Sequence, residues 1–235
     1  MKAPKPMSLT LRVLARLLSY PDAELRAHLN EMRQALRSEA ALTPARLDEV
    51  EALLASIGAQ SAIDAEADYV QLFDSGRRTS LQLFEHVHGD SRDRGPAMID
   101  LAQTFEKAGL YLAEGEMPDH LPVVLEYAST QPPREARAFL AEMAHILNVI
   151  FNALQQRQSR YASALGALIE LAGEKAAPVQ LPDEEGLDDS WAEPEAFGGC
   201  SSAGQARPGQ PQPIQIVRHP APPAAPAAAS QGASA

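Results

Sequence analysis

The stretch from Tyr69 to Asp100, YVQLFDSGRRTSLQLFEHVHGDSRDRGPAMID, joins a helical pattern to a dense cluster of polar residues. An apolar run that includes Phe84 leads into charged and histidine side chains, and Gly95–Pro96 then opens the next apolar pattern. A second short motif, DHLP, follows at residues 119–122. Polar groups that gather between helices are typical of a recognition surface rather than of a core.

Apolar residues recur at helical spacing on both sides of this stretch. The first stripe ends at Pro21, because proline cannot continue a helix. Asp22 is then placed to cap one helix whose apolar face runs from Leu25 to Leu36. A longer stripe extends from Arg134 to Leu154, and alternating β-branched runs are absent. The pattern therefore predicts an all-α, single-domain helical bundle with short connections.

The composition changes after residue 175. Ten of the 19 prolines lie between residues 176 and 235, in a segment that begins acidic and ends rich in proline and alanine. Such a segment has too little apolar surface to offset the entropy lost on ordering. We expect a helical domain over residues 1–175 and a disordered tail over residues 176–235, with Trp191 in the tail as a candidate docking element.

Charge and composition exclude several classes of function. A net charge of −11 disfavours nucleic acid as a partner, because phosphate binding depends on Lys and Arg. The single cysteine, Cys200, permits neither an internal disulfide nor a cysteine cage for zinc. No signal-peptide pattern and no window of 18 apolar residues is present. We expect a cytoplasmic protein without direct insertion into a membrane.

The central stretch resembles the NarJ family of assembly chaperones of respiratory nitrate reductase, within the broader TorD-like group of redox-enzyme chaperones. The runs YVxLFD, SLxLFEHVHGDSRDRGxAMIDL and PDHLPVVLEY carry the resemblance, which extends from about Leu11 to about Leu171. It implies a TorD-like fold and a chaperone that is not an enzyme and carries no cofactor of its own.

The resemblance also implies a client, the N-terminal segment of the apo form of the nitrate reductase catalytic subunit. It further implies that the chaperone holds that subunit competent for insertion of the molybdenum cofactor and for assembly before it docks at the membrane. A TorD-like chaperone of a different molybdoenzyme is the alternative within the same class.

A peptide groove is the function that the polar cluster favours. Apolar residues such as Phe84 and Val87 would form its floor and carboxylates its rim, so that an amphipathic, basic segment fits. Asp119 is also expected to cap the helix that Pro122 enters. Arg92 and Arg94 are expected to pair with Asp90 and Asp93 and so to fix the loop. The expected client-binding residues are Tyr69, Asp74, Leu83, Phe84, Glu85, His86, His88, Asp90, Asp119, His120 and Leu121.

A different class of function, a small metal-dependent hydrolase, would use His86, His88 and His120 as ligands. Residues two apart on a helix point about 200° away from each other, so His86 and His88 can share a metal only on an extended segment. Their apolar neighbours favour a helix. No Gly-x-Ser-x-Gly motif or phosphate-binding loop accompanies them, and the peptide-binding interpretation is preferred.

Overall fold

The computed structural model describes residues 5–89 and 91–179, which are helical apart from turns and one isolated bridge. The first six helices are α1 (Ser8–Leu17), α2 (Ala23–Ala27), α3 (Leu29–Glu39), α4 (Pro44–Ala59), α5 (Ala62–Phe73) and α6 (Leu83–Val87). The others are α7 (Arg94–Lys107), α8 (Leu121–Thr130), α9 (Pro133–Glu142), α10 (Ala144–Gln156) and α11 (Ala162–Ala172). The predicted all-α class is confirmed for this part of the chain. Asp90 and the expected tail from residue 180 onward, with Trp191, lie outside the described residues.

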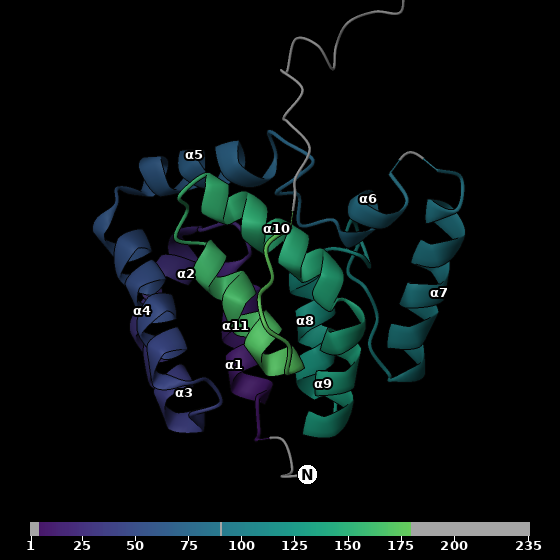
Figure 1. Cartoon of the computed structure of the whole chain (residues 1–235), viewed down its shortest axis with the longest axis horizontal. Helices are drawn as coiled ribbons and strands as arrows, with labels where there is room; N and C mark the ends of the chain where they lie inside the picture. Colours follow the sequence, from purple (N-terminus) through teal and green to yellow (C-terminus); the bar gives the residue numbers. More distant parts are fainter. Residues whose placement is uncertain (1–4, 90, 180–235) are drawn as a thin grey trace, which may run out of the picture. The chain divides into compact units, whose positions relative to one another are not determined.

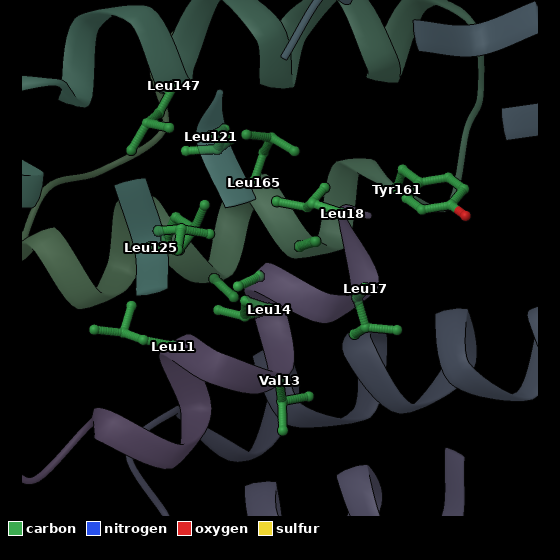
Figure 2. Close-up of a cluster of buried hydrophobic side chains, with 14 of the residues drawn as sticks. Leu11, Val13, Leu14, Leu17, Leu18, Leu121, Leu125, Leu147, Tyr161 and Leu165 are labelled. Atoms are coloured by element: carbon green, nitrogen blue, oxygen red, sulfur yellow. The ribbon is translucent and has the colours of Figure 1, made fainter. Parts of the chain in front are cut away.

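Helices α1 and α11 occupy the middle of the bundle (Figure 1). Helix α1 packs against α3, α8 and α11, and α11 also packs against α4, α9 and α10. Figure 2 shows leucines from α1, α8, α10 and α11 pointing toward one another. The fully buried members are Leu11, Leu14, Leu17, Leu18, Leu121, Leu125, Leu147 and Leu165. Full burial of a leucine stabilises a fold by about 1.5–3 kcal/mol, so this cluster holds α8 firmly and with it the DHLP motif.

Side-chain caps form the start of α2, which the sequence predicted at Asp22, and the start of α5. The Asp22 carboxylate accepts a hydrogen bond from the Leu25 N–H at 2.8 Å, and the Ser61 hydroxyl accepts one from the Asp64 N–H at 3.1 Å. Helix α11 ends at Gly173, whose φ of 85° is the left-handed conformation that glycine adopts without strain.

The prediction of a single helix from Asp22 to Leu36 is wrong, because the helix is interrupted at His28. The His28 ring Nδ1 lies 2.8 Å from the Glu24 carbonyl oxygen. That carbonyl is the normal acceptor for the His28 N–H in an α-helix. The His28 N–H donates instead to Leu25, at 3.1 Å, which tightens the turn and separates α2 from α3.

The stripe from Arg134 to Leu154 forms two helices, α9 and α10, which meet at an angle of 66°. At the junction the Met143 N–H donates to the Leu140 carbonyl three residues back, at 3.2 Å. The bend lets α9 pack on α8 while α10 packs on α6 and α11. Among the described helices none is long and apolar enough to cross a membrane alone, although α9 and α10 together reach the required length and composition.

Candidate functional site

The two polar motifs of the sequence meet at the start of α6. An antiparallel bridge pairs Gln82 with His120. The N–H groups of Leu83 and Leu121 each donate across it, at 3.0 and 2.8 Å, to carbonyls of the opposite segment. The expectation that these motifs lie together is therefore met by main-chain hydrogen bonds rather than by side chains alone.

Asp119 connects three helices. Its side chain is fully buried, and its Oδ2 accepts a hydrogen bond from the Phe84 N–H at 3.1 Å, which caps α6. The Arg94 guanidinium from α7 lies 3.7 Å from the same oxygen. Only His120 separates Asp119 from the first residue of α8, Leu121. Burial raises the pKa of the Asp119 carboxyl, opposed by the Phe84 N–H and by Arg94.

Two expectations about Asp119 are corrected by this geometry. A carboxylate with no exposed surface cannot form the rim of a groove, and it caps α6 rather than α8. The N-cap residue of α8 is His120, which makes no side-chain cap bond. Pro122 in the first turn of α8 has no N–H to satisfy, so a cap is needed less there. Arg94 pairs with Glu85, at 3.6 Å, and with Asp119 rather than with Asp93.

Three other expected site residues belong to the core. Leu83 and Leu121 are 1% and 0% exposed. Tyr69 is 7% exposed, and its hydroxyl donates to the Leu18 carbonyl at 2.8 Å. Burial raises the pKa of the Tyr69 hydroxyl, with smaller contributions from Tyr161 and Asp74. The structure thus makes these three side chains supports of the site and not contacts on its surface.

The remaining expected residues within the described part are accessible. Asp74 is exposed at the end of α5, and Phe84, Glu85, His86 and His88 are each partly exposed on α6 and its C-cap. The ring Nε2 of His86 lies 2.9 Å from the Ser80 carbonyl oxygen, whereas the His88 ring packs edge-to-face on Phe84. No three His, Cys, Asp or Glu residues within the ranges 5–89 and 91–179 are grouped to hold a metal, so the hydrolase alternative has no ligand set there.

His120 is half-buried beside Asp119, and burial lowers the pKa of its imidazole. Carboxylates at Asp119, Glu116 and Asp74 act in the opposite direction without reversing the shift. The folded protein therefore keeps this ring neutral at pH values where the unfolded chain already binds the proton.

We expect His120 to make the protein less stable in mild acid. Its contribution is fully present above the unfolded imidazole pKa of about 6.5 and is lost as pH falls toward the lower folded value. Urea unfolding at neutral and mildly acidic pH should show a smaller loss of stability in His120→Gln than in the wild type. His145→Gln, on the exposed side of α10, is the matched control and should follow the wild type. An unchanged pH dependence in His120→Gln would contradict the assignment.

A pocket of about 400 Å³ lies between α7, α8 and the loop that joins them, and the sequence analysis did not anticipate it. Tyr111, in this loop, is 80% exposed. The signal that was available is the apolar run Leu110–Leu112 inside a loop flanked by Gly109 and Gly115. The residues that line the pocket are Arg12, Phe105, Leu110, Tyr111, Leu112, Glu116, Val123, Glu126, Tyr127, Ser129 and Thr130.

The pocket has an aromatic floor, which Phe105 of α7 forms together with Tyr127 of α8. Helix α7 is described throughout and buries only Phe105. The Phe105 ring lies 4.8 Å from that of Tyr127, which in turn contacts Phe139 at 5.1 Å. On the same helix Ile99 remains 59% exposed. An apolar helix face with so little cover leaves room for another apolar segment.

Two carboxylates and one guanidinium line the pocket. Glu126 is exposed on α8, and Glu116 accepts a hydrogen bond from the Ala113 N–H at 2.9 Å, which shapes the loop. The Arg12 Nε donates to the Ser129 hydroxyl at 3.3 Å. With two negative groups against one positive group, the pocket favours an apolar ligand that carries positive charge.

Comparison with known proteins identifies the family. The profile described as nitrate reductase delta subunit matches residues 19–166. The chain belongs to this family. The resemblance to the NarJ family that the sequence suggested is thereby confirmed.

Three relatives of this chain carry the names of assembly chaperones. The nitrate reductase molybdenum cofactor assembly chaperone NarJ of Escherichia coli K12 is 42% identical, over 82% of this chain and 88% of its own length. The probable chaperone NarW of the same strain is 37% identical over 78% and 80%, respectively. The probable chaperone NarJ of Bacillus subtilis is 32% identical over 68% and 86%. These names describe chaperones and not catalysts, in agreement with the expectation that the chain is not an enzyme.

Proposed function

We propose that this protein is a cytoplasmic assembly chaperone for a respiratory nitrate reductase. It binds the N-terminal segment of the catalytic subunit in its apo form and supports insertion of the molybdenum cofactor before the enzyme docks at the membrane. The chaperone class rests on the family and its named relatives. The observation that supports peptide binding is the pocket between α7 and α8.

Both the pocket and the surface of α6 contact the client. An apolar face of the client lies against Tyr111, Val123 and Tyr127, as an amphipathic helix does in a hydrophobic groove. Basic residues of the client meet Glu126 in the pocket and the accessible Glu85 of α6. The two surfaces are connected by the loop that carries Glu116 and ends at Asp119, because Asp119 holds α6 and contacts Arg94 at the start of α7.

The experiment that tests the client is co-purification of the tagged full chain from nitrate-respiring cells of its own source. The nitrate reductase catalytic subunit should be recovered, and a synthetic peptide of its N-terminal segment should bind the purified chaperone in calorimetry. Recovery of a different molybdoenzyme would transfer the proposal to that enzyme. Absence of binding by the peptide would remove the N-terminal segment as the recognised part.

Charges at the pocket should change affinity in opposite directions. Glu126→Gln removes an exposed carboxylate and should weaken binding of the basic N-terminal peptide about two- to fivefold, as expected for a partly screened charge contact. Arg12→Gln removes the opposing charge and should tighten binding. Calorimetry at low and high salt measures both, and the difference between the variants should shrink in high salt. Equal affinities for the two variants would place the peptide elsewhere.

A further inference from the structure

After Gly173 the chain turns back and runs along α10 (Figure 1). We refer to residues 174–179 as the strap. The Ala177 N–H donates to Oδ1 of Asn148 at 2.9 Å, and Nδ2 of Asn148 donates to the Ala177 carbonyl at 2.8 Å. A single side-chain amide thus makes both hydrogen bonds that a neighbouring strand makes with one residue of an antiparallel sheet.

A second asparagine, one helical turn further on, continues this pattern. Nδ2 of Asn152 donates to the Ala177 carbonyl at 2.9 Å, and Oδ1 of Asn152 accepts a hydrogen bond from the Val179 N–H at 3.4 Å. Four helical residues rise about 6 Å, and two extended residues advance about 6.6 Å, so the asparagine pair matches the repeat of an extended chain. Pro178, between the two bonded residues, has no N–H to offer.

The hydrogen bonds between the asparagine pair and the strap go to main-chain N–H and carbonyl groups. These hydrogen bonds do not depend on the identity of the side chains of the bound segment. The requirement is an extended segment with N–H groups at alternate positions. Other extended peptides can meet this requirement as well as the strap does.

The strap is held weakly. Residues 174–178 are exposed and Val179 is half-buried, so the strap adds little apolar surface to the core. The hydrogen bonds between the strap and Asn148 are exposed, and so is the hydrogen bond from Asn152 to Ala177. Water or another peptide can replace such hydrogen bonds at a small net cost in free energy. A segment held in this way can be exchanged without disturbing the bundle.

The strap lies on a helix that adjoins the candidate site, because α10 packs against α6. We propose that Asn148 and Asn152 form a binding site for extended backbone, which the strap fills in the free chain and an extended part of the client takes over. This proposal rests on the proposed function, since the client is the segment that displaces the strap. The strap then acts as a built-in competitor that lowers client affinity.

The test uses the full chain and calorimetry with the synthetic N-terminal peptide of the catalytic subunit. Ala177→Pro removes the N–H that Asn148 accepts and frees the site, so binding should tighten about two- to tenfold, the factor of one exposed hydrogen bond. Asn148→Leu combined with Asn152→Leu removes the site, so binding should weaken by a similar factor. Pro178→Ala, which changes no hydrogen bond to α10, is the control and should match the wild type.

Opposite shifts in the strap variant and the site variant support the shared site. Shifts in the same direction, or no shift in either, overturn it and leave the asparagines as an anchor for the strap alone. Circular dichroism checks that each variant is folded, and Asn148→Asp, which keeps the acceptor and loses the donor, replaces the double variant if that one is not. Failure of the wild-type chain to bind the peptide is a distinct result, since it rejects the proposed function and this inference with it.

Discussion

Replacement of Asp119 by alanine is expected to lower the free energy of unfolding by about 2–3 kcal/mol, the range for loss of a hydrogen bond to a buried charged group. The carboxylate caps α6 through the Phe84 N–H and lies 3.7 Å from the Arg94 guanidinium. In the alanine variant both the N–H and the guanidinium lose this carboxylate as a partner. Urea unfolding at neutral pH measures the change. Weaker client binding should accompany it, because α6 loses its side-chain cap while the main-chain bridge to the DHLP segment remains.

Asp119→Asn is the matched control. The amide keeps an oxygen that accepts from the Phe84 N–H and removes the buried charge, so its cost should be below about 1 kcal/mol. Because burial raises the pKa of Asp119, the folded state binds this proton at a pH where the unfolded chain, with a pKa of about 3.9, has lost it. The wild type therefore loses stability from this group as pH rises through that range, and the asparagine variant does not. An alanine variant as stable as the asparagine variant would show that the cap contributes nothing.

Replacement of Tyr111 by alanine should have the largest effect on client binding. Its side chain is 80% exposed at the pocket, so its removal should change stability by no more than about 0.5 kcal/mol. An exposed aromatic ring at a pocket is a typical hot spot, and the loss of about 2 kcal/mol of binding corresponds to a roughly 30-fold weaker affinity. Calorimetry with the N-terminal peptide measures the affinity.

Ile63→Ala is the control for this prediction. Ile63 is 78% exposed on α5, and α5 contributes no residue to the pocket. Both variants lose an exposed apolar side chain, and only the Tyr111 variant should lose affinity. Equal affinities for the two would exclude the pocket as the place where the client binds.

Local signals in the sequence predicted the helix ends well. The cap at Asp22 was predicted from the sequence, and both it and the cap at Ser61 involve residues only three positions apart. The break at His28 was missed because it depends on a ring that competes with a main-chain N–H for one carbonyl, and no proline or glycine marks it.

The candidate site could be predicted only in part, for a different reason. The sequence brought α6 and the DHLP motif into one hypothesis, but not the direction of the Asp119 side chain, which caps a helix 35 residues earlier in the chain. The pocket draws on α1, α7, the following loop and α8, so no single segment carries its pattern. Some residues that were expected to bind the client are buried in the core, such as Leu121, whereas others are accessible, such as Glu85.

Helix α7 buries only Phe105, and beyond this side chain it contacts α6 and the DHLP segment through the partly exposed Arg94. This limited attachment has a consequence for the dynamics of the chaperone. A helix with one buried side chain opens at a small fraction of the free energy that unfolds the whole domain, since few contacts are lost. Such an excursion would leave the leucine cluster of α1, α8 and α11 intact while the aromatic floor beside Tyr127 widens. We therefore expect the volume of the pocket to adjust to the size of a client residue through a change in the position of α7.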